Sequence, residues 1–338
     1  METIQDLLPF ALESYRAGAQ LTPQRNTAAS GLDFDQQLDL ALSNRLPVRE
    51  QLLVRFISGV RSGGLTAARN NHLIEAQQAL VEGRRVLASD LLSTEAKLIV
   101  ETFHEAVAAY VEYKRGDVSM AEARVRKALA IDCTLIDRYG YEILDLHRVQ
   151  LAHNLMRLDI HRGNLVAAAE MCTHLLSYLE GRAAEWPLPD FRIDTDPAKL
   201  PVELRSAMLV QILGELALCL GTRKDDEAAR VFAPLLPHVG MEAPCSRHAR
   251  AHCWLRAKYA YVNQEPAVFV RRVSELLREG PGAMLLLWRG AVLDLLELCR
   301  DLEGKEAARI RSEILTDSQR WTNVPRQFRT RVEFASAA

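Results

Sequence analysis

Apolar residues recur along this chain at intervals of three and four, the spacing that places them on one face of an α-helix. The pattern predicts helices over residues 4–17, 34–44, 48–60, 67–87, 94–114, 119–131, 141–161, 165–179, 202–220, 225–236, 247–262, 266–278, 283–302 and 305–315. No stretch alternates apolar and polar residues between turn signals, as a half-buried strand would. The sequence therefore predicts an all-α fold.

Several segments interrupt this pattern. A polar stretch covers residues 18–31, and Ser62-Gly63-Gly64 is expected to break the chain. Residues 182–201 hold Trp186 and four prolines, which exclude a continuous helix. We expect that segment to be a hinge between lobes, a docking segment or lid, or a loop held against the helices by its tryptophan.

These interruptions predict how the chain is divided. The expected parts are an irregular helical region at 1–62, a first lobe at 63–181, the proline-rich segment at 182–201, a second lobe at 202–320 and a frayed basic tail at 321–338.

A short unit occurs twice within the first lobe. Gly116-Asp117 and Gly163-Asn164 each separate two helical patterns. Glycine tolerates the left-handed backbone that ends a helix, and Asp or Asn can cap the next one. Each unit is therefore a helix hairpin with an apolar face that it cannot bury alone, so hairpins must stack.

These hairpins resemble tetratricopeptide repeats. The resemblance is carried by Gly116 with the small Ala121, by residues 128–132, and by Gly163 with Ala168, although the two glycines are 47 residues apart rather than about 34. It implies a divergent, TPR-like α-solenoid of stacked antiparallel helix hairpins.

In this family the first helix of each hairpin lines a concave groove that binds peptides or partner proteins. Carried over to this chain, the groove residues are Tyr110, Tyr113, Lys114, Gln150, His153, Arg157 and His161. Positions 150, 153, 157 and 161 share one helix face, and aromatic and cationic groups together suit an acidic or C-terminal peptide. The alternative is a solvated helix face. The Lys and Asn set of the carboxylate-clamp subfamily is missing, so a chaperone-tail function does not carry over.

The charge and cysteine patterns narrow the class of protein. A formal net charge of −2 argues against a general nucleic-acid binder. The six cysteines are scattered singly, as is typical of reduced thiols in a cytoplasmic protein.

Charged residues inside the two most apolar segments, 202–220 and 283–299, argue against membrane spans. The excess apolar surface of those segments leaves a homo-oligomer open.

Cys245, His248 and His252 stand at i, i+3 and i+7, so they share a helix face and are weak candidates for zinc ligands. Alternatively, Cys245 caps the helix while the histidines pack or face solvent. Glu101 with His104 forms half of a di-iron motif without a second half. The acidic run 225–227 could hold magnesium, or could simply start a helix. We expect no cofactor.

No phosphate loop, Gly-x-Ser-x-Gly elbow or His-Glu-x-x-His motif is present. This favours a non-catalytic, bacterial-type cytoplasmic scaffold or adaptor that binds a protein or peptide. The alternative is an all-α enzyme or ligand sensor with a pocket between helices.

Overall fold

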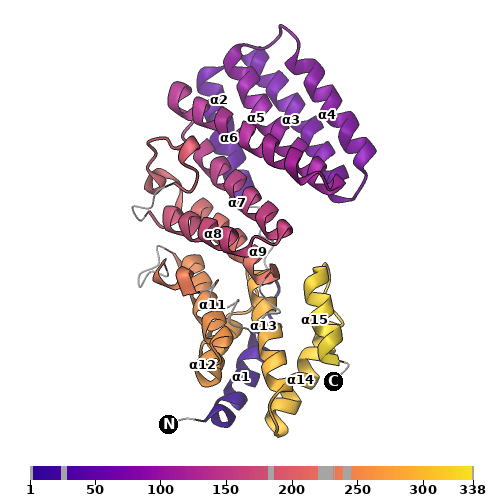
Figure 1. Cartoon of the computed structure of the whole chain (residues 1–338), viewed down its shortest axis with the longest axis vertical. Helices are drawn as coiled ribbons and strands as arrows, with labels where there is room; N and C mark the ends of the chain where they lie inside the picture. The colour runs from indigo at the N-terminus through magenta and orange to yellow at the C-terminus, as the bar shows by residue number, and fades with distance from the viewer. Residues whose placement is uncertain are drawn as a thin grey trace. The chain divides into compact units, whose positions relative to one another are not determined.

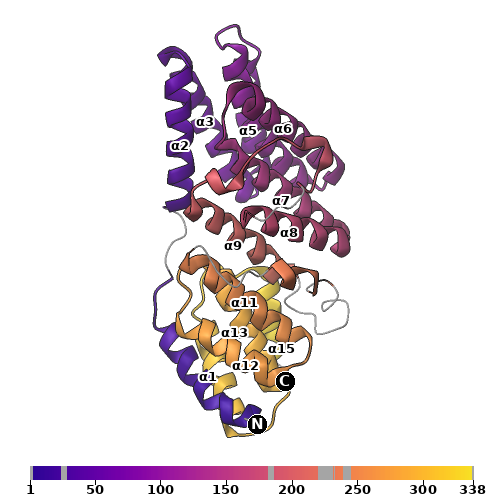
Figure 2. The ribbon, with the colours of Figure 1, turned by 90° about the vertical axis from the view of Figure 1, so that its left-hand side faces the viewer.

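The computed structural model describes residues 3–23, 29–181, 186–219, 231, 233–238 and 245–336 (Figures 1 and 2). Every regular element within these ranges is a helix, which confirms the all-α prediction. Contacts divide the chain into two compact units. The internal unit is Gly31–Leu204, and the terminal unit joins Met1–Ser30 to Arg205–Ala338.

The internal unit consists of helices that pack in chain order (Figure 1). They are α2 (Ala29–Arg45), α3 (Val48–Arg69), α4 (Leu73–Leu87), α5 (Thr94–Arg115), α6 (Val118–Tyr139), α7 (Leu144–Arg162) and α8 (Leu165–Leu179). The pairs α3–α4, α5–α6 and α7–α8 are each joined by a short turn. Further contacts of α3 with α5, α4 with α5 and α6 with α7 hold successive pairs together.

The predicted turns between these helices are present. α5 ends at Gly116 with φ of 86°, and α7 ends at Gly163 with φ of 82°, a left-handed conformation that other residues rarely adopt. Asp117 caps α6 by accepting a hydrogen bond from the Met120 N–H at 2.9 Å. Asn164 precedes α8 but makes no such cap bond, so its predicted capping role is not observed.

The predicted break at residues 62–64 is wrong, because α3 runs through it to Arg69. A Cβ atom at buried Gly64 would lie 2.9 Å from the Cβ of Ala79 on α4. The glycine therefore allows two helices to approach closely, and the helix predicted over 67–87 is divided at Asn70–His72 instead.

The terminal unit combines the first helix of the chain with the last ones (Figure 2). Its helices are α1 (Ile4–Ala19), most of α9 (Val202–Cys219), α11 (Ser246–Val262), α12 (Pro266–Arg278), α13 (Leu285–Arg300), α14 (Lys305–Ser318) and α15 (Arg326–Ser336). α13 contacts α11, α12, α14 and α15, while α1 packs against α12 and α14.

The predicted irregular region 1–62 is divided between the two units. Its helix α1 belongs to the terminal unit, whereas α2 and α3 belong to the internal unit. The Tyr15 hydroxyl donates to the Asp317 carboxylate at 2.9 Å, and its ring stacks on Trp288 at 6.0 Å. A Cβ atom at Gly18 would lie 1.8 Å from the Leu277 carbonyl oxygen, so only glycine permits this approach of α1 to α12. These contacts tie α1 to the C-terminal helices.

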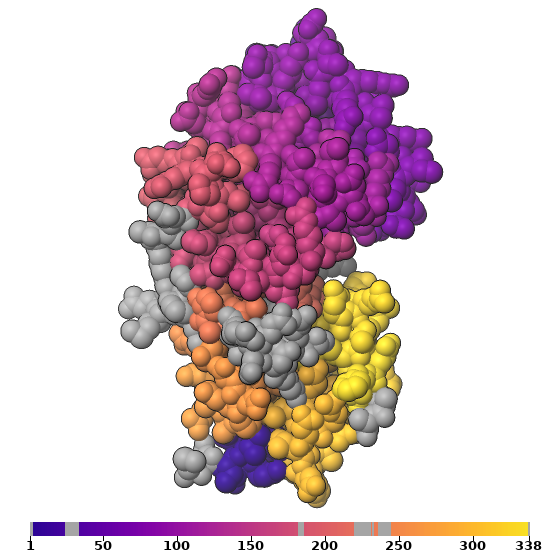
Figure 3. All heavy atoms as spheres, viewed as in Figure 1, coloured from indigo at the N-terminus to yellow at the C-terminus, as the bar shows by residue number. Residues whose placement is uncertain are grey.

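The predicted frayed tail is wrong as well, since residues 326–336 form the packed helix α15, yellow in Figure 3. Phe328 is fully buried, and Arg331 is 3% exposed. The Arg331 guanidinium donates to Asp294 and Glu297 of α13, both at 2.7 Å. A basic tail thus becomes a helix because two buried carboxylates of α13 bind its arginine.

Lys258 of α11 completes this buried network. Its ammonium donates to both Asp294 oxygens at 2.9 and 3.1 Å, and the Tyr261 hydroxyl donates to Glu297 at 2.7 Å. Burial lowers the pKa of Lys258, against the opposing effect of Asp294. The network joins α11, α13 and α15 through two cations and two carboxylates.

Replacing Arg331 with methionine should lower the free energy of unfolding by about 3–5 kcal/mol, because it leaves buried carboxylate charge without its partner. Urea unfolding measures the change. Arg326→Met, at an exposed position of the same helix, is the matched control and should change stability by less than about 0.5 kcal/mol. Equal losses for both variants would contradict a structural role of the network.

Candidate functional site

Five of the predicted groove residues lie close together on α5 and α7. The Tyr113 ring meets the His161 ring edge-on at 5.3 Å, and the rings of Tyr110 and Tyr113 are 6.4 Å apart. The Lys114 ammonium lies 5.8 Å from the centre of the Tyr110 ring. We call Tyr110, Tyr113, Lys114, Arg157 and His161 the tyrosine cluster.

A small pocket of about 40 Å³ opens inside this cluster. Tyr110 and Tyr113 line it from α5 and Arg157 lines it from α7, while Ala121 and Val125 of α6 line it between them. The small side chain of Ala121 thus forms part of the pocket wall. The volume fits the tip of one side chain rather than a whole ligand.

The charge around the tyrosine cluster is mainly positive. Lys114 and His161 are exposed, and Arg157 is half-buried at the pocket. The nearby Glu112 carboxylate lies 3.6 Å from Arg115 and 3.7 Å from Arg124, so its charge is balanced locally. Such a surface can receive a carboxylate next to an aromatic or apolar side chain.

The other two predicted groove residues are placed differently. Gln150 is half-buried and does not line the pocket. His153 is 1% exposed, so it does not face an open groove, because the middle of α7 is covered by the helices packed on it. Within the described part of the chain, neither ring nitrogen of His153 has a hydrogen-bond partner. Burial, helped by the Arg157 charge, lowers its pKa to about 3.

Two of the weak zinc candidates, Cys245 and His248, contact the Ser206 hydroxyl. The Ser206 hydroxyl lies 2.6 Å from His248 Nδ1 and 2.8 Å from Cys245 Sγ. His248 and His252 are both buried, with rings edge-on at 6.0 Å. In the ranges that the structure describes, no three His, Cys, Asp or Glu side chains are grouped to hold a metal ion. Cys245 precedes α11 without a side-chain cap bond.

The di-iron half-motif is likewise occupied by protein contacts. Glu101 pairs with Lys127 at 2.6 Å, and His104 Nε2 accepts a hydrogen bond from Arg84. The acidic run 225–227 lies outside the described residues. All six cysteines are free thiols, as their scattered positions predict.

The tryptophan of the proline-rich segment contacts α7 and α8, as is expected of a loop held against the helices by Trp186. The Arg148 guanidinium lies 4.2 Å over the Trp186 ring and donates to the Phe191 carbonyl at 2.6 Å. Tyr178 meets Trp186 edge-on at 5.1 Å and bonds the Thr195 hydroxyl at 2.6 Å. Residues 182–185 lie outside the described part.

Sequence reasoning missed the residues that hold this segment. Asp145 and Arg148 form a buried ion pair at 2.6 Å, and Asp145 also accepts a hydrogen bond from Tyr178. The available signal was their i, i+3 spacing on one helix, because opposite charges at that spacing can form an ion pair. The spacing predicts the ion pair but does not predict that it is buried.

No known protein family, curated protein or solved structure matches this chain. Among the described helices, none combines the length and the apolar character needed to cross a bilayer.

The burial of His153 predicts a specific acid sensitivity. Its pKa of about 3 in the folded protein lies below the ordinary value of 6.5, so protons bind the unfolded state preferentially as the pH falls through 6.5. Between pH 7 and pH 4 this should remove about 3 kcal/mol of stability.

His153→Leu should therefore lose less stability than the wild type over that interval, as measured by urea unfolding at pH 7, 5.5 and 4. His161→Leu, at the exposed end of the same helix, is the control. Parallel pH profiles for the wild type and His153→Leu would contradict this role of the buried imidazole.

Trp186→Ala should lower the free energy of unfolding by about 3–5 kcal/mol, because a buried aromatic ring is removed from its contacts with Arg148 and Tyr178. Trp321→Ala, at a half-buried tryptophan, should lose less. Calorimetric unfolding of both variants makes the comparison. A loss below about 1 kcal/mol for Trp186→Ala would show that the ring does not hold the segment.

Proposed function

We propose that this protein is a non-catalytic scaffold or adaptor that binds an acidic peptide segment of a partner protein at the tyrosine cluster. The observation that carries the proposal is the small pocket between Tyr110, Tyr113 and Arg157, next to the exposed Lys114 ammonium and the exposed His161 ring.

The chemistry of the tyrosine cluster supports this choice of partner. Tyrosine and arginine dominate the binding energy of many protein interfaces, since they combine a large contact area with hydrogen-bonding groups. The pocket would take the tip of one apolar or aromatic side chain of the peptide. The cations around it would pair with neighbouring carboxylates, and hydrogen bonds between charged groups are the stronger ones.

The order of the helices supports a tetratricopeptide-like array in the internal unit. The pairs α3–α4, α5–α6 and α7–α8 follow one another, and each pair contacts the next. In such an array the first helices of successive pairs share one face, so a peptide laid across α5 and α7 would contact both halves of the tyrosine cluster.

The experiment is selection of peptides from a random library on the purified protein, followed by affinity measurement for an enriched sequence. Enriched peptides should be acidic and carry an aromatic or large apolar residue. Lys114→Glu should weaken binding about tenfold and reduce its dependence on salt, since an attractive charge becomes repulsive. Tyr113→Ala should weaken it by a similar factor through loss of the pocket wall.

Lys97→Glu is the matched control, because it reverses a charge near the start of the same helix, α5. It should leave the affinity unchanged. Binding that is equally strong in the wild type, Lys114→Glu and Tyr113→Ala would place the partner elsewhere, and the absence of any enriched peptide would contradict the proposed function.

A further inference from the structure

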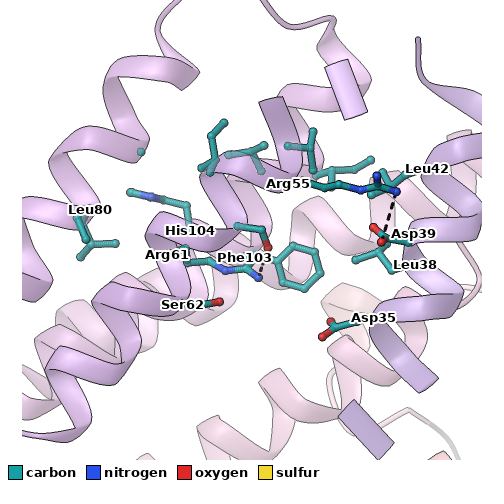
Figure 4. A pocket seen from close by; sticks show the side chains of 17 residues that line it. Asp35, Leu38, Asp39, Leu42, Arg55, Arg61, Ser62, Leu80, Phe103 and His104 are labelled. Atoms are coloured by element: carbon teal, nitrogen blue, oxygen red, sulfur yellow. Dashed lines mark hydrogen bonds and ion pairs between the residues drawn. The ribbon is translucent and has the colours of Figure 1, made fainter. Parts of the chain in front are cut away.

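A second and larger pocket, of about 260 Å³, lies in the internal unit between α2, α3, α4 and α5 (Figure 4). Much of its wall is apolar, with contributions from Leu42, Val54, Ile57, Leu80 and Ile99. It shares no lining residue with the tyrosine cluster. Two of its charged residues, Arg61 and Asp35, form no ion pair with each other, unlike Asp145 and Arg148 elsewhere in the unit.

Arg61 brings an uncompensated positive charge into this pocket. Its guanidinium lies 4.6 Å over the Phe103 ring and donates to the Ser58 hydroxyl at 2.9 Å. In the described part of the chain no carboxylate forms an ion pair with it. Burial lowers the pKa of Arg61 to about 10, against the opposing effect of Asp35. Most of its five N–H groups remain available to an anion.

His104 of α5 lines the same pocket and adds a second donor. Its Nε2 accepts a hydrogen bond from Arg84 Nε at 3.3 Å, which assigns the proton of the neutral ring to Nδ1. Burial lowers the pKa of His104 and so favours this neutral form. A Cβ atom at Gly83 would lie 3.1 Å from Nδ1, so the glycine leaves that side of the ring uncovered.

Asp35, an exposed residue of α2, contributes a carboxylate to the lining of the same pocket. It forms no ion pair with the described residues, whereas its neighbour Asp39 pairs with Arg55 at 3.4 Å, as Figure 4 shows. Burial raises the pKa of Asp35, although Arg61 opposes the shift. Besides the Asp39–Arg55 pair, the pocket lining therefore holds one cation, Arg61, and one carboxylate, Asp35, that form no ion pair with each other.

This arrangement selects the charge type of a ligand. A simple anion would pair with Arg61 and be repelled by Asp35. A simple cation would pair with Asp35 and be repelled by Arg61. A molecule with both charges satisfies both residues, and an apolar portion of it would cover the aliphatic wall. The volume is near the lower limit for small-molecule sites, so the ligand must be small.

We propose that this pocket binds a free α-amino acid with an apolar side chain. Its carboxylate accepts hydrogen bonds from Arg61 and from His104 Nδ1, its ammonium pairs with Asp35, and its side chain packs against Leu42, Ile57 and Ile99. The amino acid binds without reaction. The site goes beyond the proposed peptide scaffold, because it adds a small-molecule ligand at separate residues.

Isothermal titration calorimetry on the full chain tests the ligand class with L-leucine and L-phenylalanine as probes. At least one should bind saturably at micromolar to millimolar concentration. 4-Methylpentanoate, which lacks the ammonium of leucine, and 3-methylbutylamine, which lacks its carboxylate, should each bind at least about tenfold more weakly, since each leaves one charged residue of the pocket unpaired.

Variants test the location. Arg61→Met and Asp35→Asn should each weaken amino-acid binding about tenfold to a hundredfold, while Arg69→Met, at an exposed position of the same helix as Arg61, should not change it. Asp35→Asn preserves the side-chain shape, so it remains informative if Arg61→Met is unstable in a thermal unfolding control. Lys114→Glu should retain full amino-acid binding, which separates this site from the tyrosine cluster.

Three results would overturn the proposal. The first is the absence of saturable binding of either amino acid at millimolar concentration. The second is binding of 4-methylpentanoate as strong as that of leucine, which would remove Asp35 from the site. The third is amino-acid binding that both Arg61→Met and Asp35→Asn leave unchanged, which would place the ligand outside this pocket.

Discussion

A helix with one apolar face is stable only when another element covers that face, and this constraint organises both units. In the internal unit the cover for each helix pair is the next pair in the chain. Beside α7 and α8, the pinned segment with Trp186 covers part of the surface. In the terminal unit the cover comes from distant parts of the chain, with α1 on α12 and α15 on α13.

Charged side chains are buried in these interfaces mainly where a partner neutralises them. Asp294 meets both Lys258 and Arg331, and Asp145 meets Arg148. An isolated buried charge is costly, so such pairs can persist only with close hydrogen bonds. The pocket with Arg61 and Asp35 differs from these pairs, because its half-buried guanidinium and its exposed carboxylate form no ion pair with each other. The two separate charges beside an apolar wall are the physical basis for assigning a ligand to it.

The sequence predicts the helices well, because the spacing of apolar residues records which face of each helix is covered. It fails where the outcome depends on a distant partner. Gly63-Gly64 indicates a break by local propensity, whereas the approach of α3 to Ala79 of α4 makes Gly64 a packing residue. The arginines after residue 321 indicate a solvated tail, whereas Arg331 is bound by Asp294 and Glu297.

The candidate sites show the same limit. Tyr110, Tyr113, Arg157 and His161 lie close together on two helices, α5 and α7. The helical register places the two residues of each helix on one face, whereas the contact between the helices depends on how they pack. The burial of His153 depends on how the helices around α7 pack, and the helical register of α7 carries no information about that packing. The pocket of Arg61 draws on four helices, so no single motif of the sequence could indicate it.

The pairing of α1 with the last helices has a consequence for how the protein is made. Tyr15 bonds to Asp317, a residue 302 positions later in the chain. At the usual speed of translation, about 5–20 residues per second, α1 leaves the ribosome some 15–60 s before this partner exists. Its apolar residues Leu8 and Leu12, buried in the finished protein, stay open to chaperones during that time. The internal unit can fold meanwhile, so α1 is packed later than helices that are synthesised after it.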